Sequence, residues 1–198
     1  MRHLIRPVLL LLITAGLAAC SAPPVPKHQF YRLTAGAPAA TSPVRLDGVL
    51  MVDRPNADGV YSERALVLSR HADRSMIEQY HYHFWAESPA AMLQQQIVGF
   101  LREADIARQV VTPELRIRND YALTSKILRM ERIIDGPSPR VALTIEFALH
   151  NYRDNRLLLL ETYREEADAR SDSMSDAITA LDEALNRILN RLLTDASK

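Results

Sequence analysis

The stretch VALTIEFALH, residues 141–150, decides the fold because its large apolar side chains alternate strictly with smaller or polar ones. Successive side chains of a β-strand point to opposite faces, so every second residue shares a face. One face would carry Val141, Leu143, Ile145, Phe147 and Leu149. This pattern predicts a strand with one face in the core and the other more polar.

Turn sequences flank this strand on both sides. Asp135 to Pro139 reads DGPSP, and Asn151 to Asn155 reads NYRDN, both rich in residues that favour turns. Residues 121–134 before the first turn are apolar at too many positions for strict alternation, which indicates a long strand with a partly covered second face. Residues 156–165, RLLLLETYRE, form a third predicted strand. The three together predict an antiparallel meander.

Two helices are predicted from capping residues and apolar spacing. Ser88 followed by Pro89 is typical of a helix start, with serine as N-cap and proline at the first helical position. A second helix is expected over residues 175–193, capped by Ser173 or Ser175. The apolar residues recur every three or four positions. They are Leu93, Ile97, Phe100, Leu101 and Ala104 in the first helix and Ile178, Leu181, Leu185, Ile188 and Leu192 in the second.

The remaining β-rich stretches precede the meander. Short strands are predicted over residues 44–52, 64–70, 76–85 and 106–111. The order strands, helix, strands, helix favours an α+β fold: a single domain, residues 44–194, with a mainly antiparallel sheet and two helices packed on one face.

The N-terminus resembles a bacterial lipoprotein signal. Arg2 and Arg6 precede a short apolar run, and Leu-Ala-Ala leads into Cys20, the only cysteine of the chain. We expect a signal peptide over residues 1–19, an acylated Cys20 as the mature N-terminus, and a Pro/Ala-rich tether over residues 20–43. FYRL, residues 30–33, is predicted to be a short ordered piece within this tether. The alternative is a plain secretory signal with an incidental cysteine.

Composition limits the function classes. The 24 Lys and Arg residues balance the 24 Asp and Glu residues, so loss of Arg2 and Arg6 with the signal leaves a formal charge of −2. Near-neutrality gives no electrostatic argument for binding nucleic acid. One cysteine permits neither an internal disulfide nor a thiolate zinc cluster. The sequence also has no phosphate loop and no GxSxG nucleophile motif. We therefore expect a protein that is not an enzyme and holds no cofactor.

Two histidines, His81 and His83, are candidate metal ligands because they stand two residues apart. In a strand they would share one face, but a catalytic zinc usually needs three protein ligands and a structural zinc four. No spacing selects a third ligand among His71, Glu87 and His150. We expect structural histidines, with the core face of this strand made by Tyr80, Tyr82 and Phe84.

The order of several motifs resembles the ABC-type transport auxiliary lipoprotein family, which includes paraquat-inducible protein C. The lipobox is followed by FYRL and by a strand-to-helix junction in which Trp85, Ser88 and Pro89 stand at the family's typical positions. NDYALTSKILRMER, ETYREEA and the closing DAITALDEALNRILNRLL follow in the family's order. The resemblance covers residues 30–193.

This resemblance implies a non-enzymatic accessory of an ABC or MCE-type envelope system that moves lipids or other hydrophobic compounds. It implies an MCE-domain protein and an ABC permease and ATPase as partners, and leaves a homo-oligomer open. Ser21 is not an inner-membrane retention signal of the enteric kind, so the expected location is the periplasmic face of the outer membrane, anchored through Cys20. Two alternatives stay open: a metal-binding lipoprotein or hydrolase using His81 and His83, and a structural lipoprotein of a secretion or cell-wall assembly.

Overall fold

The computed structural model describes residues 26–39, 46–70, 75–134 and 138–196. The predicted signal peptide, the predicted acylation site Cys20 and the candidate ligand His71 lie outside these residues.

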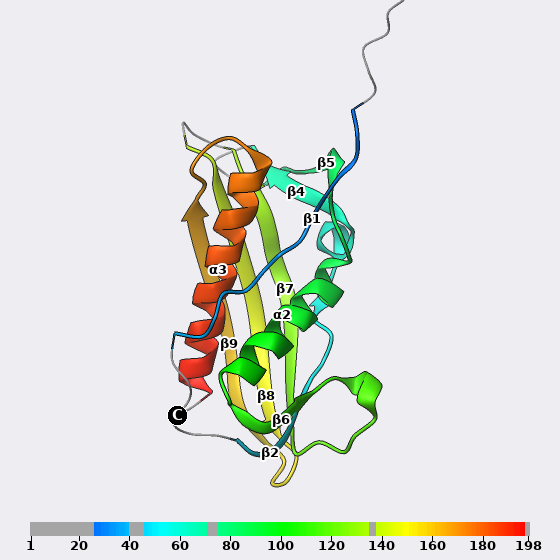
Figure 1. Cartoon of the computed structure of the whole chain (residues 1–198), viewed down its shortest axis with the longest axis vertical. Helices are drawn as coiled ribbons and strands as arrows, with labels where there is room; N and C mark the ends of the chain where they lie inside the picture. The colour runs from blue at the N-terminus through cyan, green and yellow to red at the C-terminus, as the bar shows by residue number, and fades with distance from the viewer. Residues whose placement is uncertain (1–25, 40–45, 71–74, 135–137, 197–198) are drawn as a thin grey trace, which may run out of the picture.

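Three long strands lie side by side at one side of the sheet, as the alternating pattern predicts (Figure 1). They pair antiparallel in chain order, with Ile127 opposite Ile145 and Ile145 opposite Tyr163. The side chains of this row are all buried, which closes the core beneath the helices. The strands are β7 (Tyr121–Ile133), β8 (Arg140–Asn151) and β9 (Arg156–Asp168).

Six short strands complete the sheet on the edge of β7 that does not pair with β8. Three of them pair in succession along β7, and all three run parallel to it: β2 (Leu46–Val52), β3 (Asn56–Ala57) and β4 (Ala65–Ser69). The others extend the sheet outward: β6 (Ala107–Val111) parallel to β2, β5 (Ile77–Trp85) antiparallel to β4, and β1 (Gln29–Tyr31) parallel to β5. The antiparallel pairing expected from the sequence therefore holds for the long strands, whereas most of the short strands run parallel to their neighbours.

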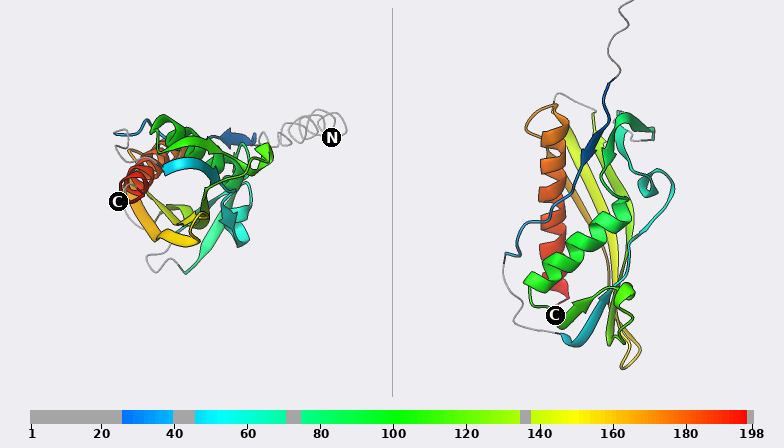
Figure 2. Two further views of the ribbon diagram at one scale, coloured as in Figure 1. Left: turned by 90° about the horizontal axis from the view of Figure 1, so that it is seen from below. Right: turned by 45° about the vertical axis from the view of Figure 1, so that its right-hand side comes forward.

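Both helices lie on the same face of the sheet, which curls around them (Figure 2). Helix α2 (Pro89–Glu103) begins where Ser88 Oγ accepts a hydrogen bond from the Ala91 amide, at 3.3 Å. Helix α3 (Met174–Asp195) begins where Ser173 Oγ accepts one from the Asp176 amide, at 3.1 Å. The two capping oxygens satisfy amides that lack a partner within the helix. The single-domain α+β fold with two helices on one face is thus confirmed.

Two short 3₁₀ turns lie between the strands. Single 3₁₀ turns cover Gly59–Ser62 and Pro113–Leu115. In the part of the chain that the structure describes, neither helix is long and apolar enough to cross a bilayer.

The segment 32–39, here called the strap, crosses the outer surface of both helices after β1. Leu33 is 1 % exposed and its amide faces the Met92 sulfur at 3.2 Å. Further along, the Ala35 amide donates to Gln96 Oε1 of α2 at 2.9 Å, and the Ala39 amide donates to Asn190 Oδ1 of α3 at 2.8 Å. The predicted tether of residues 20–43 therefore contains a strand and a strap that are part of the folded domain.

Candidate functional site

The junction between β5 and α2 holds three segments of the fold together. Trp85 is 3 % exposed, and its amide donates to the Arg64 carbonyl at 2.7 Å. The next amide, Ala86, donates to the Tyr31 carbonyl of β1 at 2.7 Å. The Arg64 guanidinium returns hydrogen bonds to the carbonyls of Trp85 and Ala86. The junction therefore contacts β1 through the Tyr31 carbonyl and the residue before β4 through Arg64, while Ser88 caps α2.

The prediction that Tyr80, Tyr82 and Phe84 form a core face is wrong. Tyr82 is 37 % exposed, and Tyr80 and Phe84 are only half-buried. The pairing of β5 with β4 shifts between Ala65 and Val67, so strict alternation is broken within the aromatic stretch. Trp85 is the fully buried residue of β5, and Tyr80 packs against the core from a half-buried position.

The two histidines have different surroundings. His81 is exposed, whereas His83 is half-buried and its Nδ1 lies 2.8 Å from the Tyr31 hydroxyl. Burial, and then the nearby positive charge of Arg132, lowers the pKa of His83, which favours the neutral ring. Among the described residues, no three His, Cys, Asp or Glu side chains lie close enough together to bind a metal ion. Glu87, one candidate third ligand, accepts a hydrogen bond from Gln95.

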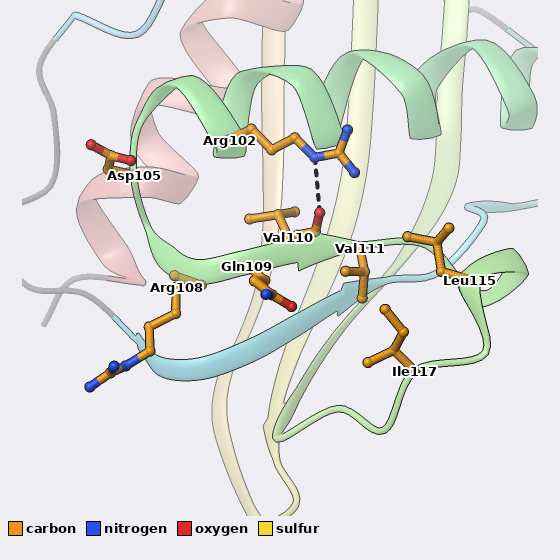
Figure 3. Close-up of a pocket in the computed structure, with 9 residues that line it drawn as sticks. Arg102, Asp105, Arg108, Gln109, Val110, Val111, Leu115 and Ile117 are labelled. Atoms are coloured by element: carbon orange, nitrogen blue, oxygen red, sulfur yellow. Dashed lines mark hydrogen bonds between the residues drawn. The ribbon is translucent and has the colours of Figure 1, made fainter.

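A surface pocket of about 380 Å³ lies at the outer edge of β6, here called the distal pocket (Figure 3). Three elements build it: the end of α2, strand β6 and the loop that follows β6. Figure 3 shows Val111, Leu115 and Ile117 gathered at one side and Asp105 and Arg108 at the other. Leu115 and Ile117 are 54 % and 43 % exposed, so an apolar surface is open to solvent here.

Two arginines define the polar part of the distal pocket. Arg102 Nε donates to the Val110 carbonyl at 2.9 Å and so occupies an acceptor on the open edge of β6. Arg108 Nε pairs with Asp47 Oδ1 at 2.5 Å. The lining residues combine an apolar surface with paired charges, an arrangement suited to binding an apolar side chain rather than to acid–base chemistry.

Sequence reasoning missed the distal pocket. The available signal is the run Leu115-Arg116-Ile117-Arg118, which places two apolar residues in a stretch that follows Pro113 and has no predicted partner strand. Such residues have no local reason to be buried, and the structure leaves all four exposed.

Two solved structures share the fold at low sequence identity. Protein XCC0632 from Xanthomonas campestris superposes with a TM-score of 0.73 at 20 % identity, covering 83 % of this chain and 92 % of that one. The hypothetical protein CT253 from Chlamydia trachomatis gives a TM-score of 0.51 at 12 % identity, covering 76 % and 98 %. These likenesses support the fold alone. The chain matches no curated protein.

A family model describes nearly the whole of the folded domain. The model for the ABC-type transport auxiliary lipoprotein component matches residues 31–192, which begins in β1 and ends in the last turns of α3. The matched span includes the strap, the β5–α2 junction and the distal pocket. The chain therefore belongs to the ABC-type transport auxiliary lipoprotein family.

Proposed function

We propose that this protein is a non-catalytic docking subunit, anchored by acylated Cys20 to the periplasmic face of the outer membrane. Its partner is the MCE-domain component of an ABC-type system that moves lipids or other hydrophobic compounds across the envelope. The observation that carries the proposal is the family match over residues 31–192 together with the lipobox before Cys20. Energy for transport comes from the ATPase of that system.

The shape of the domain supports a docking role. The described chain begins at one end of the longest axis, and β6 lies at the opposite end (Figure 1). Residues of β6 line the distal pocket, which therefore lies at that end too. An anchor attached through the N-terminal segment would therefore keep the pocket on the side away from the membrane. Exposed Leu115 and Ile117 would then face a partner that reaches across the periplasm.

Affinity purification of the intact, C-terminally tagged protein from membranes tests this function. The wild-type chain is expected to recover the MCE-domain protein and the ABC permease. A double variant, Leu115→Asp with Ile117→Asp, is expected to lose both partners because it places two charges on the apolar side of the pocket. Leu128→Asp is the matched control, since Leu128 is 39 % exposed at the β7 bulge and lies outside the pocket lining.

Two results would contradict the proposal. Recovery of secretion or cell-wall assembly proteins without any ABC or MCE component would favour the structural lipoprotein instead. Stoichiometric zinc in the purified protein, lost on the double change His81→Ala and His83→Ala, would favour the metal-binding alternative.

A further inference from the structure

Aromatic rings gather on the outer side of β1 and β5, here called the aromatic surface. The His28 ring centroid lies 5.9 Å from that of Tyr82 and 5.2 Å from that of Phe84. Phe30 completes the group at 5.9 Å from Phe84. These distances are those of aromatic rings in mutual contact, so the four side chains form one continuous surface.

The aromatic surface is exposed to solvent although its side chains are largely apolar. Phe30 is 58 % exposed and Tyr82 is 37 % exposed. Clustered apolar exposure of this kind marks a surface that contacts another apolar phase or a partner.

One basic side chain contacts the aromatic surface, and two more lie near it in the sequence. The Arg64 guanidinium carbon lies 5.4 Å from the centroid of the Phe30 ring, and Lys27 and Arg32 flank β1 in the sequence and are exposed. Aromatic rings settle at the headgroup level of a bilayer, and nearby Lys and Arg residues are attracted to anionic headgroups. Protein interfaces also use aromatic residues and Arg, so the choice of a bilayer as the contacting phase depends on the predicted acyl anchor that lies close to β1 in the chain.

The length of chain before β1 brings a bilayer within reach. Eight residues, 21–28, lie between the predicted acylation site Cys20 and Gln29, the first residue of β1, which makes nine residue-to-residue steps. Fully extended, that length spans at most about 30 Å. A surface held this close meets the bilayer at a high effective concentration, so a small aromatic patch is sufficient to orient the domain.

We propose that the aromatic surface formed by His28, Phe30, Tyr82 and Phe84 rests on the phospholipid bilayer that holds the acyl chains of Cys20, and so fixes the orientation of the domain. This inference rests on the proposed function in one respect, the acylation of Cys20. It adds a second, non-covalent membrane contact and makes the opposite end, with the distal pocket, the one that points into the periplasm.

The test uses the full lipidated protein in vesicles of phosphatidylethanolamine and phosphatidylglycerol. Acylated Cys20 has no free thiol, so a single introduced cysteine is the only labelling site. An environment-sensitive fluorophore is attached at Phe30→Cys or Tyr82→Cys, and lipids with brominated acyl chains serve as the quencher. Leu115→Cys and Tyr152→Cys are the matched controls, because both positions are exposed and lie away from β1 and β5.

Several-fold stronger quenching at positions 30 and 82 than at 115 and 152 is the expected result. Equal quenching at all four positions, or none, overturns the bilayer contact while leaving the anchor intact. Protection of positions 30 and 82 only after the MCE-domain protein is added would make this a protein interface instead, which also overturns the proposal.

Mass spectrometry of the N-terminal peptide separates the two proposals. Acylated Cys20 with unquenched probes refutes only the bilayer contact. Unmodified Cys20 refutes the lipid anchor and the bilayer contact together. Circular dichroism of each labelled variant shows that the fold is retained, as expected for changes at exposed side chains.

Discussion

The backbone amide of Thr34 donates a 2.7 Å hydrogen bond to Asp182 Oδ1, joining two residues 148 positions apart in the chain. Thr34 belongs to the strap, and Asp182 lies in the middle of α3. This bond holds the strap against α3. The strap therefore joins the N-terminal part of the domain to its C-terminal helix. Its contribution to stability can be measured separately from function.

Replacing Asp182 by Asn is expected to change how stability depends on pH. Burial, with the like charge of Glu183, raises the pKa of Asp182 from 3.8 to about 6, although the Thr34 amide acts in the opposite direction. A raised pKa means that the folded state binds the proton more tightly than the unfolded state, so this group favours folding more as pH falls through about 6. Urea unfolding at about pH 7.5 and about pH 5 should show the wild type gaining stability relative to Asp182→Asn on acidification.

Asp176→Asn is the control for this profile. Hydrogen bonds from Ser171 and Ser173 lower the pKa of Asp176, so its contribution is present above the unfolded value of 3.8 and is lost only below it. The difference in the free energy of unfolding between the wild type and Asp176→Asn should therefore stay constant over the same pH interval. A difference in unfolding free energy that is also independent of pH for Asp182→Asn would contradict the raised pKa of Asp182.

Truncation of the Leu33 side chain is expected to lower the stability of the domain strongly, although Leu33 lies in the segment predicted from composition to be a tether. Leu33 is 1 % exposed, and Leu33→Ala should lower the free energy of unfolding by about 2–5 kcal/mol. Phe30→Ala, at a side chain 58 % exposed, should cost far less. Equal effects in urea unfolding would mean that the strap does not belong to the cooperative unit.

Two glycine-to-alanine changes are expected to have opposite effects on the stability of the domain. Gly48 has φ +156°, and a Cβ added there would overlap Asp120 Oδ2, so Gly48→Ala should destabilise the domain by about 1 kcal/mol or more. Gly99 lies within α2, and a Cβ added there would meet no atom within 4 Å, so Gly99→Ala should stabilise by about 0.5–1 kcal/mol. Thermal unfolding of the two variants measures both, and shifts of the same sign would refute the close approach at Gly48.

A buried carboxylate on β7 is expected to be the most sensitive polar group of the sheet. Glu131 is 2 % exposed and accepts hydrogen bonds from Arg129 Nε at 2.8 Å, the Tyr61 hydroxyl at 2.6 Å and the Ser69 hydroxyl at 3.0 Å. Glu131→Ala leaves these donors without their acceptor and should cost about 3–5 kcal/mol.

Tyr61→Phe is the companion variant. It removes a single hydrogen bond from the same carboxylate and should cost only about 1 kcal/mol. Urea unfolding measures both changes. A loss for Glu131→Ala no larger than that for Tyr61→Phe would show that Arg129 and Ser69 find other partners.

Much of the fold was predictable because the relevant information is local. The alternation at 141–150 and its flanking turns predicted the three long strands, and Ser88-Pro89 predicted the start of α2 to the residue. Each of these patterns reflects the geometry of one strand, one turn or one helix end. The candidate site was not predictable in the same way, because Leu115 and Ile117 become a surface only where β6 and the end of α2 meet the loop.

The sequence by itself determined the α+β class, the boundaries of the long elements and the resemblance to a lipoprotein family, since periodicity, capping residues and motif order are properties of neighbouring residues. Only the tertiary structure decided that the short strands run parallel along β7, that β5 presents Tyr82 to solvent and Trp85 to the core, and that the strap is held by Asp182. The physical reason is distance along the chain: these features depend on contacts between segments far apart in sequence, whose pairing is set by the packing of the whole domain and by no local pattern.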